Sequence, residues 1–279
     1  MMTPNFARRL PIVAILVAML PWTGCGSDAP SRTKADRAPA PAGETLFTKL
    51  PAAHTNVDFT NDLTYTKDTN VFTYRNYHNG GGVAIGDLNG DGRQDLYFTS
   101  NQEDNRFYLN RGDWWFEDVT EAAGVAGTRA WSTGVAVADV NGDGRLDIYV
   151  CNSGEMPHDD RRNELFINQG NDENGVPQFE EQAAEYGLDH PGYSTHATFF
   201  DYDQDGDLDL YLLNNAFTPV SSFDIRNNQR DVRDELGGDK LYRNNGDGSF
   251  TDVTERAGLY ESEIAFGLGV SVGDVNRDG

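Results

Sequence analysis

The sequence predicts an all-β fold, specifically a β-propeller assembled from four-stranded blades. Three observations predict it. A loop of acidic residues and glycine recurs along the chain, a second pattern of aromatic and polar residues alternates with it, and short apolar runs bounded by Gly, Asn and Asp flank both. Such runs are typical of strands and hairpins. Because a single blade cannot bury both of its faces, repeats on one plan indicate stacked units.

The composition fits a folded and strongly acidic protein. Of the 279 residues, 38% are hydrophobic and 11% aromatic, and the formal net charge is -23. This length allows one or two domains with a sizeable core. The charge argues against nucleic acid as a partner, because phosphate binding needs clustered Lys and Arg. It suits cation binding, although an acidic surface can also serve solubility alone.

Residues 1–25 are predicted to be an export signal. Arg8 and Arg9 precede an apolar run at 10–20. That run is shorter than the roughly 20 residues that a membrane-spanning helix needs, so it is typical of a signal peptide. We therefore expect an exported protein, located at the outer membrane or cell surface or in the periplasm.

The signal ends in Thr-Gly-Cys at 23–25, which resembles the end of a bacterial lipobox. We expect lipidation of Cys25, and the only membrane contact expected is through this lipid anchor. Trp22 departs from the usual Leu, and the alternative is an ordinary cleaved signal. Residues 26–44 are rich in Pro, Ala and Ser and predict a flexible linker.

Residues 45–279 are predicted to be a partial propeller with about three to four blades. The pattern Asp-x-Asn/Asp-x-Asp-Gly-x-x-Asp begins at Asp87, Asp139 and Asp201, and a fourth copy that begins at Asp274 is cut off by the chain end. We therefore expect an N-terminal fragment of a longer protein, truncated in its fourth acidic loop.

The repeats separate constant from variable lengths. From Phe116, Phe179 and Phe250 to the first Asp of the next loop the distances are 23, 22 and 24 residues. From the first Asp of a loop to the next such Phe they are 29, 40 and 49 residues. A constant linkage indicates a packed unit, and variable lengths indicate surface loops that tolerate insertion. The insertion at 214–238 could be a binding loop, but we favour a merely solvated one.

Each repeat contains four strand-like runs, which in the first repeat are 82–86, 95–99, 106–109 and 115–119. Four strands in a repeat of about 50–75 residues is the plan of a propeller blade. Residues 46–59 resemble the last of these runs without a preceding loop. We interpret them as an outer strand that closes the ring.

The acidic loops predict calcium sites. Calcium takes six to eight oxygen ligands at about 2.3–2.6 Å, and side chains at loop positions 1, 3 and 5 converge when glycine at position 6 permits a sharp turn. Position 7 offers a backbone carbonyl and position 9 a carboxylate. Oxygen ligands without His or Cys favour calcium over zinc or copper, and magnesium demands stricter octahedral geometry. The predicted ligands are Asp87, Asn89, Asp91, Arg93, Asp95, Asp139, Asn141, Asp143, Arg145, Asp147, Asp201, Asp203, Asp205, Asp207, Asp209, Asp274, Asn276 and Asp278.

An EF-hand is excluded at position 12. An EF-hand has a bidentate Glu there, whereas these loops have Phe98, Val150 and Leu212. A single loop of this kind would be a weak signal, because Asp, Asn and Gly also cluster in plain turns. Three complete copies at one place in a larger repeat favour calcium over acidic turns without an ion.

Residues 82–87 with the loop that follows resemble the FG-GAP (VCBS) repeat of integrin α-chain propellers. Together with 77–81, 105–112 and 116–124 they are similar to bacterial lipoprotein-like members of the cartilage acidic protein family, which carry a C-terminal ASPIC/UnbV domain that this sequence lacks. The resemblance covers about residues 45–279. It implies a calcium-loaded extracellular or periplasmic propeller with a binding or cell-adhesion-like role, and it supplies no substrate.

The departures from the repeat pattern fall at positions where no side-chain ligand is expected. They are Gln204 and Arg277 at position 4 and Asp207 at position 7, which is expected to contribute its backbone carbonyl.

Two function classes follow. The first is a non-catalytic binding module with structural calcium and an unknown protein or glycan ligand. The alternative is a carbohydrate-active enzyme on a calcium propeller, such as a polysaccharide lyase, which would need a His, Tyr or Lys base in a groove. The five histidines show no paired metal spacing, there is no Gly-x-Ser-x-Gly elbow, and Cys151 is expected to be buried in a strand. We therefore predict no enzymatic activity.

Overall fold

The computed structural model describes residues 47–155, 158–217 and 229–276. The predicted export signal, Cys25 and the linker at 26–44 lie outside these ranges. Within the described ranges the helices are short: α1 (Ala52–Thr55), α2 (Thr120–Ala123), α3 (Ala183–Tyr186) and the 3-10 turns η1 (His158–Arg161) and η3 (Gln229–Asp231). None of them has the length or apolar content of a bilayer-spanning helix.

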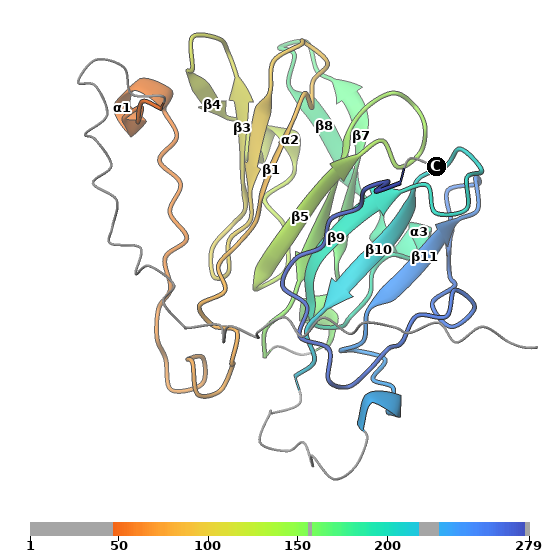
Figure 1. The fold of residues 1–279 in the computed structure, drawn as a ribbon. Coiled ribbons are helices and arrows are strands. Elements are labelled where there is room, and N and C mark those ends of the chain that lie inside the picture. Colours follow the sequence, from red (N-terminus) through yellow and green to blue (C-terminus); the bar gives the residue numbers. More distant parts are fainter. Residues whose placement is uncertain (1–46, 156–157, 218–228, 277–279) are drawn as a thin grey trace, which may run out of the picture. The chain divides into compact units, whose positions relative to one another are not determined.

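Three four-stranded antiparallel sheets follow one another along the chain, each with its strands in sequence order (Figure 1). The first contains β1 (Val83–Gly86), β2 (Asp95–Phe98), β3 (Arg106–Asn110) and β4 (Phe116–Asp118). The second contains β5 (Ser132–Ala138), β6 (Asp147–Asn152), β7 (Glu164–Asn171) and β8 (Pro177–Glu181). The third contains β9 (Ser194–Phe200), β10 (Asp209–Asn214), β11 (Lys240–Asn244) and β12 (Phe250–Asp252). The prediction of an all-β fold with four strands per repeat is confirmed.

The predicted outer strand at 46–59 is wrong. Within its described part, residues 51–55 turn into α1, and no strand is assigned before β1. Asn56 ends α1 in the left-handed conformation with a φ of 59°. The segment contacts the first sheet through side chains instead, because the Phe59 ring stacks on Phe98 with 4.9 Å between centroids.

Two hydrophobic clusters join consecutive sheets. The first contains Tyr97 of β2 together with Ile148 and Val150 of β6. The second contains Tyr149 and Cys151 of β6, together with residues of the third sheet. Successive strand residues point to opposite faces of a sheet, so β6 contributes to both cores and is apolar at four consecutive positions. Cys151 is fully buried, as the sequence predicted.

The first strands of successive sheets approach at glycines. A Cβ atom added at Gly134 of β5 would lie 2.4 Å from Thr195 O and 2.8 Å from His196 Cα. Gly82, one repeat earlier, faces Thr133 O at 2.8 Å in the same way. Glycine allows backbones to approach this closely because it has no side chain. The close packing of β1 on β5 and of β5 on β9 therefore depends on these two positions.

Threonine hydroxyls bridge the same strands. Thr133 Oγ1 lies 2.8 Å from Ser194 O, and Thr195 Oγ1 lies 3.0 Å from Gly267 O one repeat later. In the first repeat the bridging hydroxyl belongs instead to Thr99, directly after β2, which donates to Thr133 O. The segment around Gly267 therefore follows the third sheet as β5 follows the first, although no strand is assigned there.

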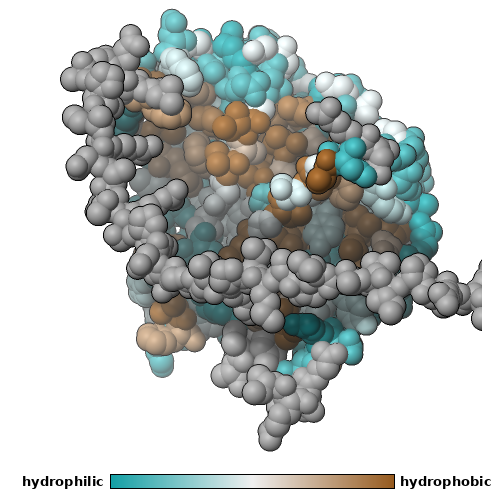
Figure 2. All heavy atoms as spheres, viewed as in Figure 1, coloured by the Kyte–Doolittle hydropathy of each residue, from teal (hydrophilic) through white to brown (hydrophobic). Residues whose placement is uncertain are grey.

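Hydrophobic residues gather on the face that carries β1, β5 and β9, the first strand of each sheet, which we call the inner strands (Figure 2). On β1, Val83 and Ile85 alternate with buried neighbours and are 55% and 58% exposed. This side of the first sheet has no neighbouring blade among the described residues.

Candidate metal centre

The acidic loops connect the first and second strands of each sheet and share one hydrogen-bond geometry. In the first loop, the Asp91 and Gly92 amides donate to the two carboxylate oxygens of Asp87, at 3.0 and 2.8 Å. The same pair of bonds surrounds Asp139 at 3.0 and 2.8 Å and Asp201 at 3.1 and 3.1 Å. The position-1 carboxylate therefore shapes the turn before any ion is considered.

The position-9 carboxylates are buried anchors as well as candidate ligands. Both oxygens of Asp95 accept backbone N–H groups, from Leu88 at 2.9 Å and from Asn110 at 2.8 Å. The bonds recur at Asp147 and Asp209, and all three residues are fully buried. Burial raises the pKa of Asp95 and of Asp147 to about 6, against the opposing effect of the two backbone donors. Sequence reasoning missed this role, because the second donor lies on the third strand of the sheet.

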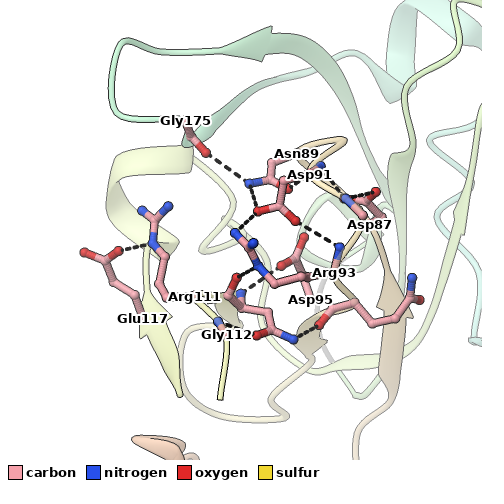
Figure 3. A network of polar contacts seen from close by, with 12 residues as sticks. Asp87, Asn89, Asp91, Arg93, Asp95, Arg111, Gly112, Glu117 and Gly175 are labelled. Atoms are coloured by element: carbon pink, nitrogen blue, oxygen red, sulfur yellow. Dashed lines mark hydrogen bonds and ion pairs between the residues drawn. The ribbon is translucent and has the colours of Figure 1, made fainter. Parts of the chain in front are cut away.

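Arginine at position 7 uses its side chain as well as its backbone. Figure 3 shows the Arg93 guanidinium beside Asp91, with which it forms an ion pair, while Arg93 Nε donates to Asn110 O at 2.8 Å. Asn89 Nδ2 also donates to Asp91, at 3.1 Å. The predicted residues of the first loop are thus brought together, and the arginine adds a contact that the sequence did not predict.

The third loop brings three carboxylates closest to one another. Ligand oxygens of Asp201, Asp203 and Asp209 all lie within 4.8 Å of one another. Within the described part of the chain, no other three His, Cys, Asp or Glu side chains meet that condition. The donor set is all oxygen and carries several negative charges, which fits a hard divalent cation such as calcium.

The fourth loop is described only in part. Asp274 and Asn276 lie in a segment without regular secondary structure, and Asp278 lies outside the described residues. Its role as a calcium loop stays a prediction.

Replacing Asp91 or Asp143 by Ala should destabilise the protein more than replacing Asp113, which lies outside any loop. Asp91 accepts the Arg93 amide at 2.9 Å and pairs with its guanidinium, so the replacement removes contacts and a candidate ligand together. We expect losses of about 1–3 kcal/mol in the unfolding free energy, measured by urea titration in calcium.

The control needs care, because Asp113 has a φ of 51°. Asn tolerates that conformation better than Ala does, so Asp113→Asn is the cleaner control and should change stability little. Losses at Asp91 and Asp143 no larger than at Asp113 would contradict the loop assignment.

A separate hollow of about 840 Å³ lies beside the third sheet, away from the loops. Lys240 is buried there, paired with Glu261 and 3.5 Å from Asp252. His190 Nδ1 and the Tyr242 hydroxyl lie 3.4 Å apart. The hollow therefore contains a His, a Tyr and a Lys, which are the residue types from which the enzyme alternative would draw its base.

The Lys240 and Asp252 pair in this hollow has an equivalent in another sheet. Arg106 and Asp118, at the equivalent positions of the first sheet, lie 3.7 Å apart. A cation at the start of the third strand facing an Asp at the end of the fourth strand thus recurs in the first and third sheets. This recurrence favours a structural role for Lys240 and Asp252.

His190 should make stability fall in mild acid. Burial lowers the pKa of His190 to about 4, and the Lys240 charge contributes. The unfolded chain takes up a proton near pH 6.5, so stability is lost as the pH falls from 6.5 to about 4, by up to about 3 kcal/mol. In urea titrations across this range, the unfolding free energy of His190→Gln should rise relative to that of the wild type as the pH falls, by up to about 3 kcal/mol, and that of exposed His54→Gln should not. An unchanged slope in His190→Gln would contradict the assignment.

Comparison with known proteins supports the repeats directly. A family model described as FG-GAP-like repeat matches residues 87–150, and one described as FG-GAP repeat matches residues 131–175. Cartilage acidic protein 1 of Xenopus tropicalis is 28% identical over 214 residues, which is 71% of this chain and 29% of that protein. The Mus musculus and Homo sapiens proteins of the same name are each 26% identical over 212 residues. The chain thus spans less than a third of the length of these relatives.

A solved structure of an Agrocybe aegerita lectin, described as recognising non-reducing terminal N-acetylglucosamine, is 22% identical and covers 60% of this chain and 36% of its own. Its TM-score of 0.30 is too low to bear on the fold. The repeat matches cover the first two acidic loops and most of the first two sheets, and the third loop and third sheet lie beyond them. The chain therefore contains FG-GAP-like repeats, its third sheet repeats the strand order of the two that match, and its sequence is similar to that of cartilage acidic protein 1.

Proposed function

We propose that this chain is a non-catalytic, calcium-binding module with a binding or adhesion-like role, and that calcium is a structural part of its blades. The observation that carries the calcium proposal is the convergence of three carboxylates in the third loop. The repeated geometry of the first two loops and the FG-GAP matches support it.

In each loop the side chains at positions 1, 3, 5 and 9 and the carbonyl at position 7 would hold the ion. Bound calcium neutralises carboxylates that otherwise repel one another. Each loop joins the end of the first strand of its sheet to the start of the second. An ion bound by the loop would therefore hold these two strands together as a hairpin. The role proposed for the metal is thus structural.

Equilibrium dialysis followed by elemental analysis tests the calcium proposal. We expect about one calcium per complete loop and much weaker retention of magnesium, which prefers its own waters. Replacing Asp201 by Asn should remove one equivalent, with Asp113→Asn as the control. Retention of no calcium above the buffer level would refute the proposal.

We also propose export and attachment to a membrane through lipid on Cys25. The apolar run at 10–20 and the similarity to cartilage acidic protein 1 support export, and the Thr-Gly-Cys sequence supports the lipid attachment. Metabolic labelling with a radioactive fatty acid should mark the wild type and the Cys151→Ala control but not Cys25→Ala. Labelling of Cys25→Ala, or none of the wild type, would contradict the anchor.

For the ligand we propose a protein or glycan that binds the variable loops. A lyase remains the alternative, favoured by the His190 and Tyr242 pair in the hollow beside the third blade. Incubating the protein with acidic polysaccharides and assaying for unsaturated sugar ends separates the two. Cleavage that disappears in Tyr242→Phe would replace the binding proposal, whereas binding without cleavage would support it.

A further inference from the structure

The first two loops contain a cation of their own. The Arg93 guanidinium pairs with Asp91 at loop position 5 and reaches the end of β3, where Nε donates to Asn110 O. Arg145 repeats the arrangement, with 2.9 Å from Nε to Asn168 O at the third strand of its own sheet. Each arginine thus links a loop carboxylate to the adjacent strand (Figure 3).

The third loop has a carboxylate where the others have the guanidinium. Asp207 stands at position 7, and a Cβ added at Gly246 would lie 3.0 Å from Asp207 Oδ2. Gly246 follows β11 as Gly112 follows β3, so Asp207 faces the turn that Arg93 approaches in the first blade. An acid therefore replaces the internal cation at the same place.

The formal charges of the loops differ accordingly. The first and second loops each have three Asp and one Arg, which gives -2, whereas the third has Asp at positions 1, 3, 5, 7 and 9, which gives -5. One divalent ion balances either of the first two loops and leaves the third at -3. The third loop is also the one with a side chain in the left-handed conformation at position 4, where Gln204 has a φ of 62° and the others have glycine.

We propose that the three loops depend on calcium unequally, with the third loop binding it most tightly and losing its shape without it. This rests on the calcium binding proposed above. Arg93 and Arg145 hold the first two loops in shape without an ion and compete with calcium for Asp91 and Asp143. The affinity of oxygen-ligand loops for calcium rises with the number of charged ligands. At positions 1, 3, 5 and 9 the third loop has four Asp and the first two have three each, so this rule also predicts the tightest binding in the third loop.

The consequence is a calcium-sensitive third blade. The third loop joins β9 to β10, and the polar hollow lies beside the same blade. A fall in calcium would therefore open this blade's first hairpin while the first two blades keep theirs. Calcium would therefore regulate ligand binding at the third blade, while the first two blades stay folded without it.

Calorimetric titration of the chain with calcium tests the order of affinities. We expect one tight site and two sites at least about tenfold weaker, with Asp207→Arg weakening the tight site about tenfold or more. Arg145→Asp should do the opposite and strengthen a second site. Because the two variants move in opposite directions, a folding defect in one cannot imitate the result. Equal affinities in the wild type would overturn this inference and leave calcium binding intact, whereas no heat of binding would refute the proposed function itself.

Hydrogen exchange with mass spectrometry locates the effect. In excess chelator, peptides that cover 201–209 should exchange at least about tenfold faster than in calcium, while those that cover 87–95 and 139–147 should change less. In Asp207→Arg the third loop should remain protected in chelator. An equal loss of protection in all three loops would overturn the inference.

Discussion

Chelating calcium with EDTA is expected to lower the melting temperature of this protein by about 5–10 °C for each site that it empties. A ligand at a concentration about 100 times its Kd stabilises the folded state by about 2.7 kcal/mol. For a domain of this size, 1 kcal/mol shifts the melting temperature by about 2–4 °C. The physical reason is the crowding of at least three aspartates in each complete loop, which repel one another when no calcium is bound. The repulsion is largest in the third loop, which has no arginine to offset it.

Melting curves followed by circular dichroism, in calcium and in EDTA, measure this shift. Magnesium at the same concentration is the control for ionic strength and should restore little of the loss. Excess calcium added after chelation should restore the original curve. Identical curves in calcium and in EDTA would mean that the loops are acidic turns without a structural ion.

Gly134→Ala is expected to destabilise the protein strongly, with a loss of about 3 kcal/mol in unfolding free energy. The new Cβ would lie 2.4 Å from Thr195 O and 2.8 Å from His196 Cα. Both atoms are backbone, so neither can rotate away. The clash would be relieved only by moving β5 from β9, which would open the second hydrophobic core.

The repeat supplies matched controls for this substitution. Gly269 stands at the same repeat position, and a Cβ there would meet nothing within 4 Å, so Gly269→Ala should change stability little. Gly82→Ala should cause a loss of stability between these two, because a Cβ added there would lie 2.8 Å from its nearest neighbour, Thr133 O. Equal urea midpoints for Gly134→Ala and Gly269→Ala would contradict the close approach of the inner strands.

The strands could be predicted because their signal is local and repeated. The run at 147–151 is apolar after its first residue because both faces of β6 are buried, and acidic and glycine residues limit it. The segment at 46–59 was misread because α1 has only four residues, too few to show a helical period, and an isolated Phe can stack without pairing its backbone. A match to one short pattern was therefore insufficient where no loop accompanied it.

The sequence predicted the acidic residues of the candidate site but not the backbone groups that hydrogen-bond to them and to the loop arginine. The partner of the Arg93 side chain is Asn110 O, 17 residues away on another strand, and the same residue supplies an amide to Asp95. These contacts depend on the register between β2 and β3, which the loop sequence does not contain.

The double burial of β6 makes the middle blade the coupling element of cooperative unfolding. Ile148 and Val150 pack toward the first blade while Tyr149 and Cys151 pack toward the third, and neither cluster joins the first blade to the third directly. In an array of units that contact only their neighbours, cooperativity passes through each shared interface. Weakening β6 would therefore separate the melting of the two flanking blades into distinct transitions, whereas an equal loss of stability in β2 or β10 would not.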